Sequence, residues 1–402
     1  MSSAKTIGVG LISVGWMGKV HTRAYQSLPI MYPELDVAPR LVIAADTSDE
    51  RQDYARDVLG FAESTADYHD VLNHPDVDVV SICAPNFLHA EIGIAAAKAG
   101  KAFWIEKPVG RGEADTQSVE DAVNTAGVTT SIGFNYRHAP AIEYAKGLIA
   151  SGDLGRITNF RGTFFADYSS DPRGALSWRF NKAQAGSGVS GDLMGHLVDL
   201  FQYILGPIDR LVGMNSIVHA KRPIPGPGAG SHFDLVEGGE LGDVENEDYA
   251  AMMVQLRADA VASSALGTLE SSRVTVGKRA SYNIEIYGTE GSLMWDFERL
   301  NELELATAGD SVRVGYQRIM AGPAFGEFSH FQPGSGTSMG FDDLKVIEAK
   351  KFIEAYLGGP ALNSNIHDAL SAARVVEASL ASQADEAWHT IAPVAGTTAA
   401  IK

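Results

Sequence analysis

Two acidic residues and one histidine stand at helical spacing in the segment 192–205. Asp192, His196 and Asp199 stand at positions i, i+4 and i+7, which places them on one face of a predicted helix. Tyr203 continues that face. Histidine is well suited to accept a proton from an alcohol near neutral pH, and Asp192 could orient the imidazole or bind a neighbouring hydroxyl. The pattern predicts a polar cleft wall with His196 as a general base, with a satisfied core histidine as the structural alternative.

A glycine-rich segment follows the first apolar run of the chain, at residues 10–18. Ser13, Gly15 and Gly18 occupy the three key positions of a G-x-G-x-x-G pattern. A dinucleotide site needs a tight turn, close backbone approach to a pyrophosphate, and a helix N-terminus aimed at it. Serine at the first position adopts unusual backbone angles less readily than glycine. The segment predicts a dinucleotide turn, although alone it also fits a generic strand-to-helix turn.

An acid ends the second apolar run and supports the dinucleotide interpretation. Asp46 follows the run 41–45 and lies 28 residues after Gly18, beyond the usual spacing of about 20. We attribute the excess to an inserted loop at residues 29–40. Asp46 would accept hydrogen bonds from the adenosine ribose and repel a 2′-phosphate, which favours NAD over NADP. The alternative is an acid that simply faces solvent.

The elements that must position these residues follow two patterns. In the first third, apolar runs alternate with amphipathic stretches, which predicts a doubly wound Rossmann domain with a parallel sheet. Those runs are 7–14, 41–45, 77–84, 102–105 and 129–134, separated by helix-like stretches such as 18–28, 50–59 and 91–99. Beyond residue 137, strand-like stretches follow one another and predict an α/β domain with an open, largely antiparallel sheet. They are 157–165, 211–218, 249–256, 261–269 and 281–287.

The length of the chain also predicts two domains. Its 402 residues exceed the roughly 250–300 that a single core supports. We expect an NAD-binding domain at 1–137 and a substrate-binding and oligomerisation domain at 138–402. Helices are expected at 342–357 and 366–385, and the second could pack back on the first domain. Long loops are expected at 223–248 and 323–340.

Composition argues against several partners. The net charge of −18 repels phosphate backbones and anionic lipid, so nucleic acid and membrane are not expected. Cys83 is the only cysteine, so no internal disulfide can form, which fits a cytoplasmic protein. No apolar run reaches about 18 residues, and no signal peptide is recognised. A G-x-S-x-G match at 336–340 lacks the preceding strand that hydrolases need, and we regard it as chance.

Taken together, the motifs resemble the glucose–fructose oxidoreductase and inositol dehydrogenase (Gfo/Idh/MocA) family. Residues 6–137 match its pattern closely, and downstream matches extend the resemblance over most of the chain. The matching segments are the glycine-rich turn, Pro-Asn-x-x-His at 85–89, Glu-Lys-Pro at 106–108, Asn-Tyr-Arg at 135–137, Trp-Arg-Phe at 178–180 and Asp-x-x-x-His at 192–196. The departure from the pattern is Ser13.

The resemblance implies an NAD-dependent dehydrogenase that moves a hydride from a secondary hydroxyl of a sugar, glycoside or inositol to NAD. It implies a site between the domains with Lys107, Asp192 and His196 as the catalytic group. Lys107 would lie beside the nicotinamide and donate to the substrate hydroxyl. The implied cofactor-binding residues are Ser13, Gly15, Trp16, Met17, Gly18, Asp46, Thr47, Ala84, Pro85, Asn86, His89, Glu106 and Lys107. The implied substrate-binding residues are Tyr136, Asp167, Trp178, Arg179, Asp192 and His196.

Other expectations concern assembly, metals and rival functions. No ligand cluster with metal spacing is apparent, so no metal is expected. The open sheet leaves a face to be covered, and relatives assemble through it, so a homodimer or homotetramer is expected. A redox-neutral lyase or glycosidase that cycles NAD would use the same residues. A non-catalytic dinucleotide-sensing protein is a further alternative, although it would normally lack the combination of Lys107, Asp192 and His196.

Overall fold

The first domain is built on a parallel sheet, as the sequence predicts. The computed structural model describes residues 4–226, 234–309 and 315–401. Six parallel strands follow the order β3-β2-β1-β4-β5-β6. Their bounds are β1 Lys5–Ile12, β2 Val37–Ala45, β3 Glu63–Thr65, β4 Val79–Ile82, β5 Ala102–Ile105 and β6 Thr130–Ile132. The strand order reverses between β1 and β4, which creates the crevice where such sheets bind their ligands.

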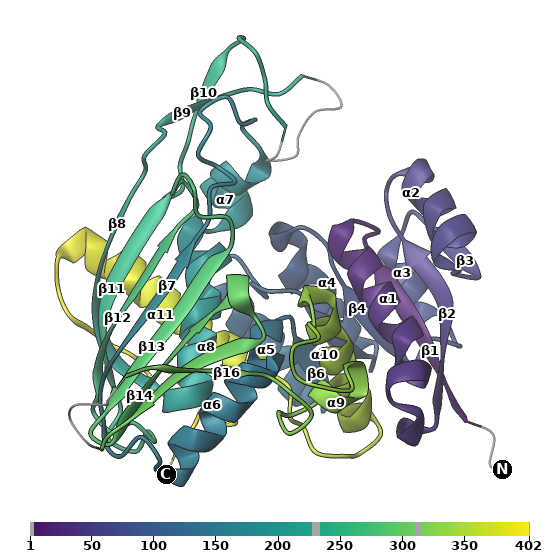
Figure 1. Ribbon diagram of the computed structural model, residues 1–402. Helices are drawn as coiled ribbons and strands as arrows, with labels where there is room; N and C mark the ends of the chain where they lie inside the picture. Colours follow the sequence, from purple (N-terminus) through teal and green to yellow (C-terminus); the bar gives the residue numbers. More distant parts are fainter. Residues whose placement is uncertain (1–3, 227–233, 310–314, 402) are drawn as a thin grey trace.

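Helices cover both faces of this sheet (Figure 1). They are α1 Trp16–Met31, α2 Asp49–Tyr54, α3 Tyr68–Asn73, α4 Asn86–Lys98 and α5 Glu113–Ala126. A π-helical turn at Ala55–Leu59 extends α2. Gly100, just past the end of α4, has the left-handed φ of +69° that favours glycine after a helix.

The inserted loop expected at residues 29–40 is wrong. Pro29 lies in the last turn of α1, where the burial of Leu28 and Tyr32 compensates for the cost of a proline within a helix. A short 3₁₀ turn at Pro33–Leu35 follows, and β2 begins at Val37. The additional residues therefore lengthen a helix and a strand, and the wide spacing between Gly18 and Asp46 needs no loop.

The second domain carries a nine-stranded sheet with the order β16-β15-β14-β13-β7-β12-β11-β8-β17. Among the strands that the structure describes, β7 and β12 pair in parallel and the other neighbours are antiparallel. Their bounds are β7 Ile157–Phe165, β8 Ile208–Ser216, β11 Tyr249–Leu256, β12 Leu266–Ser272, β13 Ser281–Gly288, β14 Gly291–Asp296, β15 Glu302–Thr307, β16 Gln317–Met320 and β17 His389–Thr390. The strand expected at 261–269 begins only at Leu266, because a turn with Ser264 at φ +57° precedes it.

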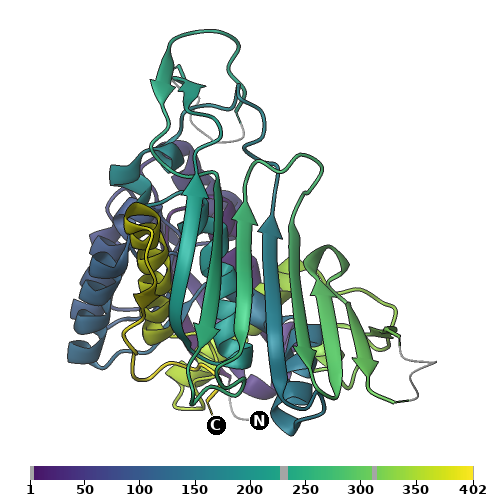
Figure 2. The same ribbon diagram turned by 90° about the vertical axis from the view of Figure 1, so that its left-hand side faces the viewer.

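One face of this sheet is covered by helices and the other is open. Helices α6 (Pro140–Ser151), α8 (Gly195–Leu205) and α11 (Ile366–Asp385) lie on the side that faces the first domain, and Figure 2 shows the open face. Met214 and Met253 on the open face are 64% and 50% exposed. The arrangement leaves apolar side chains on a broad, unpartnered surface.

A small hairpin replaces part of the loop expected at 223–248. Strands β9 (Lys221–Pro223) and β10 (Leu241–Asp243) pair antiparallel and project beyond the large sheet (Figure 1). The interior of that segment, 227–233, lies outside the described residues. The loop expected at 323–340 contains one short helix, α9 (Phe328–Phe331), and no strand leads into the G-x-S-x-G match at 336–340.

The last two long helices join the two domains. Helix α10 (Phe341–Tyr356) packs against α1 and adds Val346, Phe352 and Ile353 to the core beneath β1. Helix α11 contacts α5 on one side, where His367 Nδ1 lies 2.7 Å from Glu120 Oε1, and the large sheet on the other. In the part of the chain that the structure describes, no helix has the length and apolarity needed to cross a membrane.

Candidate active site

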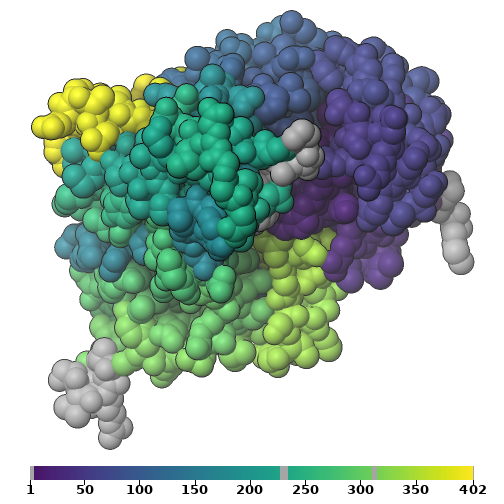
Figure 3. Space-filling view, turned by 90° about the horizontal axis from the view of Figure 1, so that it is seen from above, coloured from purple at the N-terminus to yellow at the C-terminus, as the bar shows by residue number. Residues whose placement is uncertain are grey.

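A cleft between the two domains collects most of the predicted site residues. It holds about 1460 Å³ of empty space, open solvent included. Figure 3 looks down on the seam where the first domain, in purple and blue, meets the second in teal and green. The lining includes Ser13, Gly15, Trp16, Met17, Ala84, Pro85, Asn86, His89, Glu106, Lys107, Tyr136, Trp178, Arg179, Asp192 and His196. The cleft is therefore built from strand ends of the first domain and from loops and the helices α8 and α10 of the second.

Four of the predicted residues do not line this cleft: Gly18, Asp46, Thr47 and Asp167. The Asp167 carboxylate lies 3.1 Å from the Arg279 guanidinium instead. Gly18 has a packing role, because a Cβ there would lie 2.3 Å from the Ser13 carbonyl oxygen. Asp46 lies behind the glycine-rich turn, where it is 8% exposed.

The glycine-rich turn presents a free helix N-terminus to the cleft. Ser13 has φ +75°, and its N–H donates to the Ala45 carbonyl at 2.8 Å. Gly15 caps α1, and a Cβ built on it would meet nothing within 4 Å. The first turn of α1 contains no acidic residue. An open glycine, exposed backbone N–H groups and the positive end of a helix dipole fit a pyrophosphate.

The left-handed backbone conformation of Ser13 lowers the stability of the fold, and this effect can be measured. A side chain in the left-handed region costs roughly 1–2 kcal/mol, which exceeds the extra entropy that glycine gives an unfolded chain, roughly 0.5–1 kcal/mol. Ser13→Gly should therefore raise the free energy of unfolding by up to about 1 kcal/mol and tighten NAD binding, with kcat within a few-fold. Urea unfolding and NADH fluorescence titration measure both. Ser264→Gly, at φ +57° and outside the cleft lining, is the matched control and should change stability only. A weaker-binding Ser13→Gly protein would contradict the prediction.

Asp46 holds the glycine-rich turn through two hydrogen bonds from backbone N–H groups. Its Oδ2 accepts the Val14 N–H at 2.8 Å and its Oδ1 accepts the Ser48 N–H at 3.1 Å. Arg51, which is exposed, has a guanidinium nitrogen 3.7 Å from Oδ2. The carboxylate keeps lone pairs for a ribose hydroxyl, while its charge opposes a 2′-phosphate.

We expect NAD to bind at least about tenfold more tightly than NADP, which corresponds to about 1.4 kcal/mol. Asp46→Ala should narrow the difference and also weaken NAD binding, because the Val14 N–H loses its acceptor. Arg51→Ala should widen the difference, because a cation that could attract the 2′-phosphate is removed. Titration of both dinucleotides into each apo protein measures these effects. Equal affinities in the unmodified protein would refute the assignment.

Lys107 and Asp192 form the polar centre of the cleft. The Lys107 ammonium donates to Asp192 Oδ1 at 3.0 Å and to the Asp192 backbone carbonyl at 2.7 Å. The Tyr168 hydroxyl donates to Asp192 Oδ2 at 2.6 Å, and the Arg179 guanidinium lies 3.7 Å from the same oxygen. Burial opposes the charged form, yet the Lys107 and Arg179 cations hold the pKa of Asp192 well below its usual range. Asp192 is thus an ionised anchor for Lys107.

His196 lies one helical turn beyond Asp192, among aromatic rings. Tyr136 contacts it edge-on at a centroid distance of 4.8 Å, with Phe134 at 5.7 Å. Burial, followed by the Lys107 cation, lowers the pKa of His196 well below 6.5. No hydrogen bond joins its ring nitrogens to a residue that the structure describes. A neutral imidazole that opens into the cleft is able to accept a proton.

The polar stripe predicted along this helix is only partly correct. Asp192 lies in a π-helical turn, Ser190–Met194, that precedes α8. Asp199 and Tyr203 face the interior, where the Arg137 guanidinium donates to both Asp199 oxygens and stacks on Tyr203 at 4.6 Å. The cleft ends at His196, and a carboxylate buried beyond it requires the compensating charge of Arg137.

The wall formed by Trp178 and Arg179 is held by a stacked trio behind it. Phe180 lies between the guanidinium groups of Arg222 and Arg273, 4.4 and 4.5 Å from its ring centroid. Arg222, from the β9–β10 hairpin, also donates to the Asp171 carbonyl at 2.9 Å. The hairpin therefore fixes the loop that carries Trp178 and Arg179 into the cleft.

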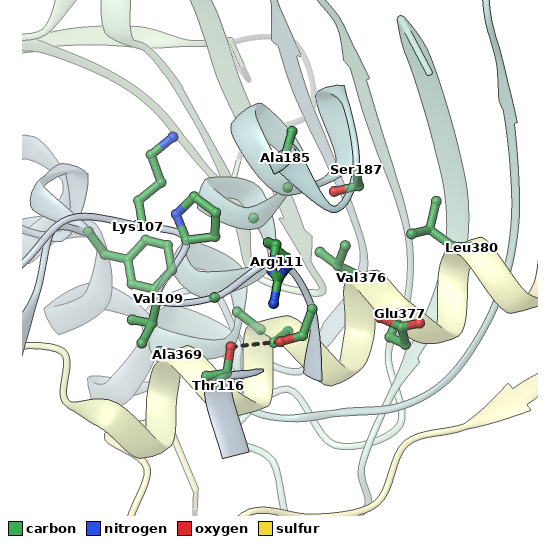
Figure 4. A pocket seen from close by; sticks show the side chains of 18 residues that line it. Lys107, Val109, Arg111, Thr116, Ala185, Ser187, Ala369, Val376, Glu377 and Leu380 are labelled. Atoms are coloured by element: carbon green, nitrogen blue, oxygen red, sulfur yellow. Dashed lines mark hydrogen bonds between the residues drawn. The ribbon is translucent and has the colours of Figure 1, made fainter. Parts of the chain in front are cut away.

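A second cavity lies behind the Lys107–Gly112 loop (Figure 4). It is lined mainly by small residues of that loop, of α11 and of the turn before α8, such as Gly110, Ala372 and Gly191. The Lys107 side chain points away from it in Figure 4. Its lining is largely apolar and lacks the convergent hydrogen-bonding groups of a polyol site, so the larger cleft remains the candidate active site.

Sequence reasoning missed two polar contributors to the site, Tyr168 and Lys345. Tyr168 follows β7 in a loop, and Lys345 stands in the middle of α10. A tyrosine in a loop and a lysine on a helix normally indicate surface positions, so the sequence carries no signal for either. Among the described residues, no group of three or more His, Cys, Asp and Glu side chains is arranged to hold a metal ion.

Comparison with known proteins supports both domains. The model for an oxidoreductase family with an NAD-binding Rossmann fold matches residues 7–134, and the GFO/IDH/MocA C-terminal domain matches 142–294. Levoglucosan dehydrogenase of Pseudarthrobacter phenanthrenivorans is 36% identical over 387 residues, covering 96% of this chain and 98% of its own. The scyllo-inositol 2-dehydrogenase (NAD(+)) of Bacillus subtilis is 25% identical over 296 residues, covering 70% and 81%.

Solved structures agree. Levoglucosan dehydrogenase in complex with NADH and L-sorbose superposes with a TM-score of 0.90 at 34% identity, covering 97% of this chain and 100% of the other. An oxidoreductase domain protein from Kribbella flavida gives a TM-score of 0.88 at 31% identity, covering 96% and 100%. The motifs, the fold and these similarities together place the chain in the GFO/IDH/MocA family of oxidoreductases, with that family's NAD-binding Rossmann domain.

Proposed function

We propose that the protein oxidises a secondary hydroxyl of a neutral cyclic sugar, with NAD as hydride acceptor. The observation that carries the proposal is the Lys107–Asp192–His196 group, which opens into the cleft beside the glycine-rich turn. An anhydrosugar or a related glycoside is the leading substrate class, because the similarity to levoglucosan dehydrogenase spans 96% of the chain. Inositols are the second class, from the weaker similarity to inositol dehydrogenases.

Each residue of the group has a distinct task. His196, neutral and open to the cleft, accepts the hydroxyl proton. Lys107 donates to the same oxygen and stabilises the negative charge that develops there. Asp192 keeps the ammonium in place through its side chain and backbone carbonyl. The N-terminus of α1 and the residues Ala84–Asn86 would hold the dinucleotide, which supplies a hydride acceptor when bound. Trp178 offers an apolar face to the sugar ring, and Arg179 offers hydrogen-bond donors.

A substrate screen tests this proposal. Purified protein with NAD is offered free sugars, glycosides, anhydrosugars and inositols, and NADH absorbance is followed together with product analysis. We expect NADH to form stoichiometrically with an oxidised anhydrosugar or glycoside. Bond cleavage without NADH accumulation would replace the proposal by the redox-neutral NAD-cycling reaction. Dinucleotide binding without turnover of any compound would indicate a sensing protein.

The open face of the large sheet leads to a prediction about assembly. Its exposed methionines, Met214 and Met253, favour a second copy as the covering partner, so we expect a homodimer or homotetramer. Light scattering at micromolar concentration should give two or four times the chain mass of 42.8 kDa. Met253→Glu should lower the mass of the assembly that light scattering measures. Ile30 is 76% exposed on α1, and Ile30→Glu should leave that mass unchanged. A monomeric mass for the unmodified protein would refute the prediction.

A further inference from the structure

A buried lysine from the second half of the chain reaches the catalytic loop. Lys345 on α10 has a side chain that is 1% exposed, although its ammonium is charged. Its Nζ lies 2.6 Å from Glu106 Oε1, a residue 239 positions away in the sequence. A buried ammonium costs several kcal/mol unless it is paired, so the contact with Glu106 is a strong constraint on both groups.

Glu106 is confined on several sides and directly precedes Lys107. His21 Nε2 lies 2.9 Å from the same Oε1, and the His21 ring is stacked on Trp104 at 3.4 Å. A Cβ on Gly133 would lie 2.6 Å from the Glu106 carboxylate, so the backbone there packs directly on it. These contacts hold the Glu106 side chain in one conformation, and they thereby fix the peptide bond that joins Glu106 to Lys107.

The charges of this cluster do not balance one to one. Two buried carboxylates, Glu106 and Glu348, share the Lys345 ammonium, which lies 2.9 Å from Glu348 Oε2. Glu106 has two partners on one oxygen, whereas Lys345 is the one described residue within ion-pair distance of Glu348. One cation compensates one anion, so Glu106 carries the negative charge and Glu348 retains a proton. Burial, with Glu106 nearby, raises the pKa of Glu348 to about 8 in agreement with this distribution.

We propose that Lys345 is a positioning residue for catalysis: by neutralising Glu106 it fixes the backbone that carries Lys107 and thereby keeps the Lys107 ammonium on Asp192. The role in turnover rests on the proposed dehydrogenase function, but the position of Lys107 does not. Lys345 and Glu106 both line the cleft together with Lys107, so the cluster adjoins the site that it orders. The contact joins the last third of the chain to the reaction centre.

The experiment combines catalysis with a measurement that needs no substrate. Lys345→Met should lower kcat at least about tenfold on the sugar that the screen identifies, with KM within about threefold. In the same variant, competitive acetylation followed by mass spectrometry should show a several-fold change in the labelling rate of Lys107. Lys345→Arg should restore part of the kcat and part of the wild-type labelling rate of Lys107. Lys350→Met is the matched control, because Lys350 stands on the same helix and pairs with Glu327 and Glu354 away from the cleft.

A second variant distinguishes a positioning role of Lys345 from a loss of activity caused by misfolding. Lys345→Met combined with Glu106→Gln removes the buried cation together with the anion that it compensates, and Glu348 keeps its proton. If Lys345 positions Lys107 through Glu106, this charge-balanced double variant retains the low kcat and the altered labelling. Wild-type kcat and labelling in either variant would overturn the proposal. If no sugar is turned over by the unmodified protein, the proposed function fails, and the labelling experiment still decides the positioning role.

Discussion

Replacement of Lys107 by alanine is expected to lower kcat by about 100-fold or more, because a positioned proton-donating group contributes 10²–10⁴-fold. The ammonium is the group placed to hold a substrate hydroxyl while it also contacts Asp192 Oδ1 and the Asp192 carbonyl. Its loss leaves Asp192 with Tyr168 and Arg179 and removes the charge that would stabilise an alkoxide. Steady-state kinetics with the preferred sugar measure the effect.

The matched control for Lys107 stands at the other end of the same strand. Lys101 precedes β5, is partly buried, and donates to the Val77 carbonyl at 2.6 Å, outside the cleft lining. Lys101→Ala should keep kcat within a few-fold. NADH binding should weaken in Lys107→Ala, which lies near the expected nicotinamide position, and should persist in the control. A Lys107→Ala enzyme that retained more than a tenth of wild-type kcat would remove Lys107 from the catalytic group.

Replacement of His196 by alanine is the second large expected effect, again about 100-fold or more in kcat. NADH affinity should largely persist, because His196 belongs to α8 of the second domain. The reaction requires a neutral imidazole, and protonation sets in as the pH falls through the pKa of the folded protein. Because that pKa is lowered well below 6.5, the acid limb of kcat/KM should lie below pH 6.5. The limb should vanish in His196→Ala.

A histidine outside the cleft provides the control for the pH profile. His367→Ala loses the contact with Glu120 between α11 and α5, and it should leave the acid limb where it is. His196→Ala turning over at the wild-type rate with an unchanged profile would show that the assigned base is wrong. Lys107 would then be the leading candidate for the base.

The parallel sheet was predictable because its strands are buried on both faces. A strand such as β5, Ala102–Ile105, is a continuous apolar run that needs no partner to be recognised. Strands β14 and β15 alternate buried and half-exposed residues in short segments, and no apolar run marks them. The hairpin β9–β10 has only three residues in each strand. Local pattern therefore predicts the first domain better than the rim of the second.

The candidate site was predictable where residues adjoin in sequence and not where the fold brings them together. Glu106–Pro108 and Asp192–His196 are compact motifs, and Glu106, Lys107, Asp192 and His196 line the cleft. Asp167 and Asp199 resemble site acids in sequence, but Arg279 and Arg137 pair with them in the fold. Lys345 shows the reverse case. In sequence it is an ordinary helical lysine, and it joins the site only because the fold brings it to Glu106, which is 239 residues away along the chain.

The position of α10 has a consequence for the order in which the protein forms during synthesis. Val346, Phe352 and Ile353 belong to the same core as Ile7 and Leu28, so the dinucleotide domain stays incomplete until nearly the whole chain has left the ribosome. A fragment that ends after β6 would display an apolar groove beside α1 and invite aggregation. The core of the dinucleotide domain is therefore complete only after α10 has been synthesised, and until then the nascent chain exposes apolar surface that α10 later covers.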